Sequence, residues 1–135
     1  MSHPTVGAMT ELPEELQPIV HDVNRCSPVR VVVREPPVRD RSGSALWVRV
    51  AGASGAIGFV PQPGAALVER TFTQADQVHD WVLECLPELG FPAVWPECPE
   101  HPGTHPLGVV LRDGVVVWAC PRSGTVHARV GGLGG

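Results

Sequence analysis

The chain has 135 residues, of which 43% are apolar and 18% charged, and its formal net charge is −4. A chain of this length is expected to form one domain that buries a core without disulfide bonds or metal staples. The net negative charge, together with scattered arginines and no lysine, argues against a dedicated nucleic-acid-binding protein.

The sequence also predicts where the protein resides. No stretch approaches the roughly 20 apolar residues that span a bilayer, and no apolar run follows a basic start. We therefore expect a cytoplasmic protein without a membrane segment. In that reducing compartment, the four cysteines indicate metal binding or free thiols in preference to disulfide bonds. Residues 1–12 are predicted to be a flexible tail, 13–131 a single α+β domain, and 132–135 a flexible Gly-rich end.

The first predicted element is a helix over residues 13–25. Its apolar side chains recur at helical spacing and define one face. Pro18 removes a backbone donor and clashes with the preceding turn, so we expect this helix to be short or broken. The residues of the apolar face are Leu12, Leu16, Ile19, Val20 and Val23.

Short strands are expected next, because apolar and polar residues alternate between turns rich in Pro and Gly. The links between these strands are too short for helical crossovers, so they predict an antiparallel meander. The predicted strands cover residues 29–35, 45–51, 56–60 and 65–70.

The main helix is predicted at about residues 73–89. Thr73 and Asp76 resemble a capping box at its start, and Gly90 is the expected C-terminal stop. One face carries a continuous apolar stripe that would pack against the core. Its members are Ala75, Val78, Val82, Cys85, Leu86 and Leu89, with Trp81 at the edge. On this stripe Cys85 is interpreted as a small hydrophobic residue.

The segment 93–131 is typical of a zinc ribbon with one altered position. Cys98 and His101 have the ligand spacing C-x2-H, and an Asp113-Gly114 turn predicts a β-hairpin. Cys120 then begins a second knuckle in which Ser123 occupies the usual place of the second ligand. The 18 residues between His101 and Cys120 fit the 15 to 20 or so that separate the two ligand pairs of a ribbon.

The fourth ligand is open between two histidines. His105 lies four residues after His101 in a turn-rich segment that can fold back on a metal, whereas His127 lies on a following strand. We prefer His105, so the predicted zinc ligands are Cys98, His101, His105 and Cys120, with sulfur and nitrogen donors as zinc prefers. Two other interpretations remain: a metal-free hairpin packed by its tryptophans, or a disulfide between the two cysteines.

The string WPxCPxHPxxHPL over 95–107, followed by WxCPxxG over 118–124, resembles the C-terminal signature of short, uncharacterised actinobacterial proteins. In these proteins a similar ADQVxDWV helix precedes the signature, as at residues 75–82 here. The resemblance covers about residues 74–131. It implies that the two cysteines and the two nearby histidines belong together, and it implies no activity.

The expected architecture is therefore an antiparallel β-meander packed on one main helix, followed by a C-terminal zinc-ribbon-like β-hairpin. The favoured function is that of a small interaction or regulatory protein whose zinc is structural and whose partner is another protein. The alternative is a zinc-dependent hydrolase with an open coordination position and Glu97 or Glu100 as general base.

Overall fold

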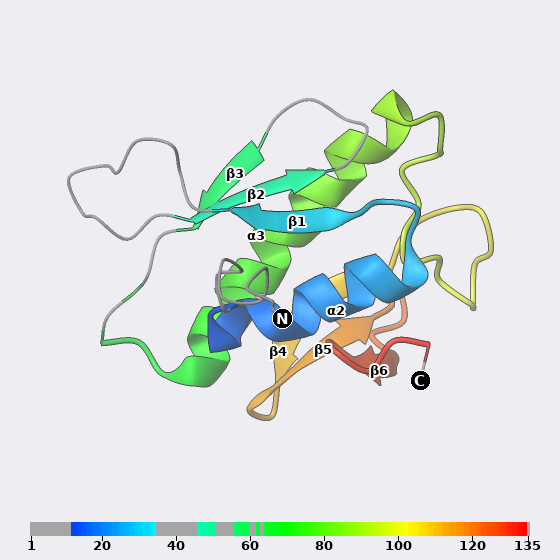
Figure 1. Cartoon of the computed structure of the whole chain (residues 1–135). Coiled ribbons are helices and arrows are strands. Elements are labelled where there is room, and N and C mark those ends of the chain that lie inside the picture. Colours follow the sequence, from blue (N-terminus) through cyan, green and yellow to red (C-terminus); the bar gives the residue numbers. More distant parts are fainter. Residues whose placement is uncertain (1–11, 35–45, 51–55, 60–61, 63, 135) are drawn as a thin grey trace.

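The computed structural model describes residues 12–34, 46–50, 56–59, 62 and 64–134 (Figure 1). Within these residues, two separate antiparallel sheets of three strands each, ordered β1-β2-β3 and β4-β5-β6, accompany the helices. The expected α+β class, the N-terminal meander and the C-terminal hairpin are confirmed. The elements are η1 (Glu14–Leu16), α2 (Gln17–Cys26), β1 (Val31–Arg34), β2 (Leu46–Val50), β3 (Ala56–Phe59), α3 (Leu67–Glu88), β4 (Gly108–Arg112), β5 (Val115–Ala119) and β6 (Val126–Arg129).

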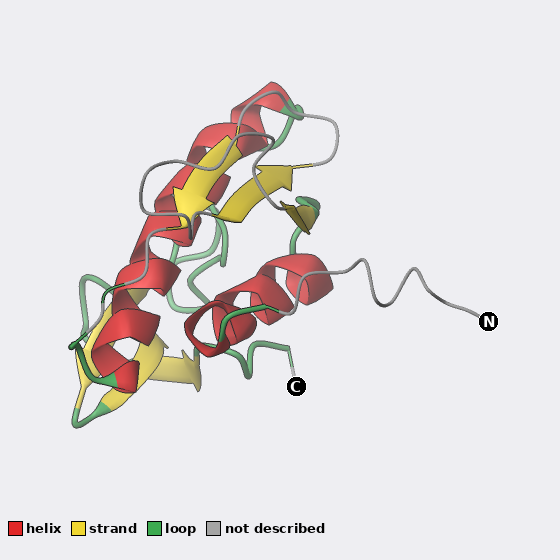
Figure 2. Ribbon diagram, turned by 60° about the vertical axis from the view of Figure 1, so that its left-hand side comes forward, coloured by secondary structure: helices red, strands yellow, loops and turns green. Residues whose placement is uncertain are grey.

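The long helix α3 joins the two sheets. It contacts β3 of the first sheet and β4 and β5 of the second, as well as η1 and α2. In Figure 1 the meander crosses the upper half of α3, and α2 lies in front, between the meander and the second sheet. Figure 2, turned by 60°, shows strands lying along the upper part of the long helix, with the shorter helix set at an angle to it. Residues 1–11 of the predicted tail and the predicted strand ends at 35, 45, 51 and 60 lie outside the described residues.

Helix α2 forms in spite of Pro18 and is short, with 10 residues, which is one of the two outcomes expected for this segment. The proline sits in the first turn of α2, where its missing N–H would have no intrahelical partner in any case. A 3₁₀ turn, η1, precedes the helix and extends the apolar face to Leu16. The side chains of Ile19 and Val23 are completely buried, as the periodicity predicts.

Helix α3 starts six residues earlier than predicted, so the fourth strand at 65–70 is wrong. Residues 67–70 form the first turn of α3, and Ala66 precedes it as the N-cap residue, whose amide donates to Glu69 Oε1 at 3.3 Å. Thr73 is not a cap: its hydroxyl donates to the Glu69 carbonyl one turn back, inside the helix. The prediction was wrong because Thr and Val are compatible with either a strand or a helix. Packing of Val68 and Phe72 against the core favours the helix.

The C-terminal end of α3 agrees with prediction. Gly90 adopts φ +88°, and its amide donates to the Pro87 carbonyl while the Phe91 amide donates to the Leu86 carbonyl. This is a Schellman motif, in which a left-handed residue after the helix lets two otherwise unpaired carbonyls accept hydrogen bonds. The predicted apolar stripe is buried from Ala75 to Leu86.

The second sheet positions the predicted metal ligands. Strands β4 and β5 pair with Val109 opposite Trp118, and the connecting turn has positive φ at both Asp113 and Gly114, as a tight hairpin requires. Strand β6 adds to the other edge of β5, with a register irregularity between Trp118 and Ala119. The completely buried Trp118 therefore lies in the central strand, two residues before Cys120.

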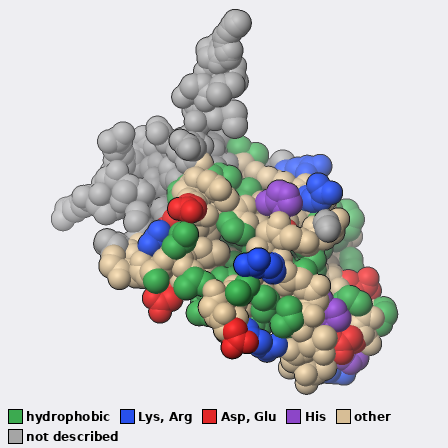
Figure 3. Space-filling view, turned by 90° about the horizontal axis from the view of Figure 1, so that it is seen from below, with side chains coloured by type: hydrophobic (Ala, Val, Ile, Leu, Met, Phe, Trp, Pro, Cys, Tyr) green, Lys and Arg blue, Asp and Glu red, His purple; other side chains and the backbone are tan. Residues whose placement is uncertain are grey.

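The surface carries charges of both signs. On the face seen from below in Figure 3, Arg and His side chains lie among acidic and apolar ones and do not form a single basic patch. No helix in the part of the chain that the structure describes is long and apolar enough to cross a membrane.

Candidate metal centre

Two loops meet at the predicted centre. The first, between α3 and β4, is closed at its base where the Leu107 amide donates to the Pro96 carbonyl at 2.7 Å. Further along this loop, the Cys98 amide donates to the His105 carbonyl, which brings both ends of the C-x2-H-x3-H segment together. The tip of the loop is shaped by Glu97, whose carboxylate accepts the Gly103 amide at 2.6 Å.

The second loop connects β5 to β6 and contains the second knuckle. The Cys120 amide donates to the Thr125 carbonyl at 2.9 Å, and the Gly124 amide donates back to the Cys120 carbonyl at 2.8 Å. Gly124 has φ +78°, a conformation that side-chain-bearing residues rarely adopt, so this position explains the glycine of the CPxxG sequence.

The structure brings all four predicted ligands together. One donor atom from each of Cys98, His101, His105 and Cys120 lies within 4.8 Å of every other. His101 Nδ1 is the hub: it lies 3.6 Å from the Sγ atom of each cysteine and 3.0 Å from His105 Nε2. The cysteines are buried and the histidines half-buried. These contacts place a Cys2His2 donor cluster between the two loops.

The spacing within the cluster matches a tetrahedral metal. Bonds of about 2.3 Å to sulfur and about 2.05 Å to nitrogen put S and N ligands roughly 3.5 Å apart and two N ligands roughly 3.3 Å apart. The observed distances are 3.6 Å for both S···N pairs and 3.0 Å for the N···N pair. A hydrogen-bonded imidazole would direct its one Nδ1–H at one neighbour, whereas three donor atoms surround this nitrogen.

The orientation of His105 also suits a metal ligand. Its Nδ1 lies 2.9 Å from the Pro106 carbonyl oxygen, which has no proton to give, so Nδ1–H is the donor. In a neutral imidazole Nε2 then carries the free lone pair, and this is the atom that faces His101. A ligating histidine usually holds its other ring nitrogen in this way, through a backbone carbonyl or a carboxylate.

The two thiols have different environments. Burial raises the pKa of Cys98, and hydrogen bonds from the backbone amides of Glu100 and His101 oppose this only in part. For Cys120 burial acts in the same direction but is outweighed by hydrogen bonds from Ser123 and Arg122, so its pKa falls to about 6. Amides directed at a thiolate favour the charged form that binds metals.

The remaining candidates lie beside the cluster. His127 Nε2–H donates to Glu100 Oε2 at 2.6 Å, and the Ser123 hydroxyl donates to the same oxygen at 3.0 Å. These two hydrogen bonds lower the pKa of Glu100. Ser123 therefore links the two knuckles through Glu100, which explains a serine at a ligand position. Of the two proposed fourth ligands, His105 is in the Cys2His2 cluster and His127 is outside it.

The structure reveals a second polar centre that sequence patterns did not indicate. Asp22 is completely buried and accepts hydrogen bonds from Trp118 Nε1 and from the amides of Gly131 and Leu133. The C-terminal segment predicted to be flexible thus has specific contacts to α2. The sequence feature that could have indicated this centre is Asp22 itself, an acidic residue within the apolar face of the first helix. The helix offers it no obvious hydrogen-bond partner.

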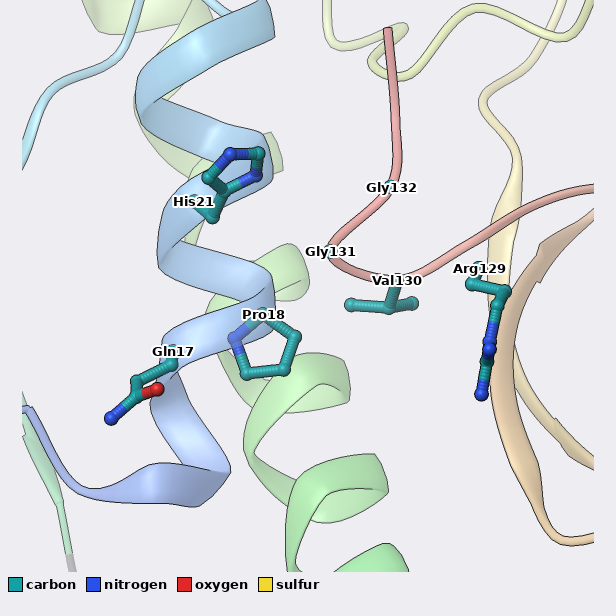
Figure 4. A pocket seen from close by; sticks show the side chains of 7 residues that line it. All are labelled: Gln17, Pro18, His21, Arg129, Val130, Gly131 and Gly132. Atoms are coloured by element: carbon teal, nitrogen blue, oxygen red, sulfur yellow. The ribbon is translucent and has the colours of Figure 1, made fainter. Parts of the chain in front are cut away.

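A shallow cleft lies between α2 and the segment that follows β6 (Figure 4). It is bounded by Gln17, Pro18 and His21 of α2 on one side and by residues 129–132 on the other. Neither the two cysteines nor the two histidines of the cluster line it.

All four cysteines of the chain are free, so the predicted alternative of a Cys98–Cys120 disulfide is not formed.

The fold and cluster define an α+β protein with a Cys2His2 donor set built by two knuckles and a hairpin. No family model, curated protein or solved structure matches this chain.

Proposed function

We propose that this protein is a small cytoplasmic interaction or regulatory protein in which Cys98, His101, His105 and Cys120 hold one structural zinc ion. The observation that carries the proposal is the convergence of two sulfur and two nitrogen donors within 4.8 Å of one another. This donor set and its near-tetrahedral spacing suit zinc better than calcium or magnesium, which prefer oxygen ligands. The kinship with short actinobacterial proteins remains part of the proposal.

A structural role is favoured because the donor set is complete. Structural zinc sites have four protein ligands, whereas catalytic sites keep one position for water or substrate. The two glutamates considered as general bases have other contacts, Glu97 to the Gly103 amide and Glu100 to His127 and Ser123. The zinc-dependent hydrolase is therefore the weaker candidate.

The consequence for the fold is that zinc would join the 96–107 loop to the β5–β6 loop. Metal binding free energy is folding free energy wherever the ligands are not preassembled in the unfolded chain. We infer that a zinc-stiffened C-terminal third presents a fixed surface to another protein, which is how small metal-stabilised domains without a catalytic position are used.

The test is metal analysis with thermal unfolding of the purified full chain. We expect one zinc per chain and a melting temperature that a strong chelator lowers by about 10 °C or more. Cys98→Ser should lose the zinc, whereas Cys26→Ser, a matched change outside the cluster, should keep it. Zinc that chelator removes without a change in melting temperature would favour the hydrolase, and a zinc-free wild type would refute both.

The interaction role has a separate test. The tagged protein, isolated from its own cells at native abundance, should elute from a sizing column in a complex of fixed composition. Elution at the 14.4 kDa of the free chain would contradict it.

A further inference from the structure

A second group of donor atoms lies next to the Cys2His2 cluster. One atom each from Cys98, Glu100 and His127 lies within 4.8 Å of the other two. The two groups share Cys98. Among their donors Glu100 is the exposed one, and its side chain keeps 30% of its surface exposed. His127 is half-buried, as are His101 and His105, and the two cysteines are buried.

Glu100 and His127 are connected to all parts of the centre. Glu100 belongs to the first knuckle, between Cys98 and His101. His127 comes from β6, and Ser123, which also donates to Glu100, comes from the second knuckle. The second group therefore extends from an exposed carboxylate, that of Glu100, to the buried sulfur of Cys98.

We propose that Cys98, Glu100 and His127 form an entry site, which binds incoming zinc first and passes it to the Cys2His2 cluster through the shared Cys98 thiolate. This inference rests on the proposed function. One sulfur, one oxygen and one nitrogen are all zinc ligands, and three protein donors leave a position for the water that a hydrated ion still carries.

The transfer is an exchange of ligands without oxidation or reduction. Zinc stays divalent and its bond to Cys98 Sγ persists. The bonds to Glu100 and His127 break as bonds to His101, His105 and Cys120 form, the remaining water leaves, and protons of the ligand thiols pass to solvent. Zinc is thus never without a protein ligand along the route.

In the metal-free state of the entry site, Glu100 and His127 are hydrogen-bonded to each other. Their donor atoms are 2.6 Å apart, closer than the roughly 3.4 Å that two ligands of one tetrahedral zinc would need. Binding of an ion must open this contact and displace the Nε2 proton of His127. Once the ion has moved on, the hydrogen bond re-forms, so the entry site does not compete with the resident site.

The experiment measures exchange of the resident ion in the zinc-loaded full chain. Isotopically labelled zinc is added, and native mass spectrometry reports stoichiometry and exchange rate together. Glu100→Gln and His127→Gln are compared with wild type and with Glu14→Gln, a matched change at an exposed glutamate of η1. Because an ion leaves by the route it enters, we expect both variants to hold one zinc but to exchange it at least about tenfold more slowly. The control should exchange like wild type.

Equal exchange rates in all four proteins would overturn the entry site and leave the structural zinc site intact. A variant that binds no zinc at equilibrium would also overturn it, because Glu100 or His127 would then be needed to retain the resident ion. A wild type without zinc would be a failure of the proposed function itself, which the stoichiometry reports before any rate is measured.

Discussion

Asp22 of α2 and Trp118 of β5, 96 positions apart in the chain, meet in a buried hydrogen bond of 2.8 Å from the indole Nε1 to the carboxylate. The same carboxylate accepts the amides of Gly131 and Leu133 at 2.6 and 3.1 Å. One side chain thus ties the first helix to the central strand of the second sheet and to the segment that follows β6.

The first prediction concerns this carboxylate. Asp22→Ala leaves the Trp118 indole and two backbone amides without acceptors in a buried site. We expect a loss of about 2–4 kcal/mol in the free energy of unfolding, since each buried unsatisfied donor is costly. Urea unfolding at neutral pH measures it, and hydrogen exchange should show reduced protection at Gly131 and Leu133. A loss no larger than that of Asp80→Ala, at an exposed position of α3, would contradict the assignment.

The second prediction compares two adjacent glycines. Gly131 has φ +101°, and a Cβ built there lies 3.0 Å from Pro18 Cβ, whereas a Cβ at Gly132 meets only the Arg129 carbonyl at 3.5 Å. Gly131→Ala should cost about 1–3 kcal/mol through backbone strain and the close approach to α2. Gly132→Ala should cost clearly less. Thermal unfolding of the two variants and the wild type measures both losses of stability. Equal losses would refute the packing of the segment after β6 on α2.

The third prediction concerns pH. Burial lowers the pKa of His79 below its usual value of 6.5, although a hydrogen bond to the Trp95 carbonyl and the nearby Asp80 and Asp76 oppose this. The unfolded chain therefore binds a proton at a pH where the folded chain does not. This contribution to stability is present above pH 6.5 and is lost as the pH falls through the folded pKa.

The variant His79→Gln keeps an N–H donor for the Trp95 carbonyl but has no titrating ring. Its urea midpoint should fall less than the wild-type midpoint does when the pH is lowered from about 7.5 to about 5. These two pH values lie on either side of the usual histidine pKa. Acid also protonates the cysteines and histidines of the Cys2His2 cluster, and that effect is common to both proteins. Identical pH dependence in both would show that His79 makes no such contribution.

The fourth prediction distinguishes the two histidines proposed as fourth ligand. His105→Gln should lower zinc affinity by far more than His127→Gln, because only His105 lies in the Cys2His2 cluster. Competition with a chromophoric chelator measures both affinities. A larger effect at His127 would transfer the ligand role to it.

The fifth prediction is a rescue of the altered knuckle. Ser123 follows Cys120 at the position that carries the second ligand of a regular knuckle, and its amide lies 3.4 Å from Cys120 Sγ. In a His105→Gln background, Ser123→Cys should restore zinc binding by completing a C-x2-H and C-x2-C set. With Co²⁺ in place of zinc, the thiolate charge-transfer absorption should increase, as expected for three sulfur ligands. Unrestored affinity would mean that the second knuckle cannot direct position 123 toward the metal.

Local patterns were sufficient for several elements. The apolar stripe from Ala75 to Leu86, the left-handed stop at Gly90 and the tight turn at Asp113-Gly114 each depend on residues within a few positions of one another. The same holds for the spacing of Cys98, His101 and His105 within one loop. Short-range periodicity and turn chemistry report such features directly.

Other features depended on distant partners. The start of α3 was misplaced because Val68 and Phe72 are indifferent to helix or strand until they meet the core. Ser123 and His127 could not be assigned from the sequence, since their roles come from Glu100 on another loop.

The sequence by itself determined that this is an α+β chain with two knuckles separated by a hairpin, because these features are written in spacing and turn residues. Only the tertiary structure decided that His105 and not His127 joins the cluster with both cysteines, and that Asp22 anchors the end of the chain. Both outcomes depend on which side chains from remote segments share one buried space. There, unpaired polar atoms are costly enough to select one arrangement.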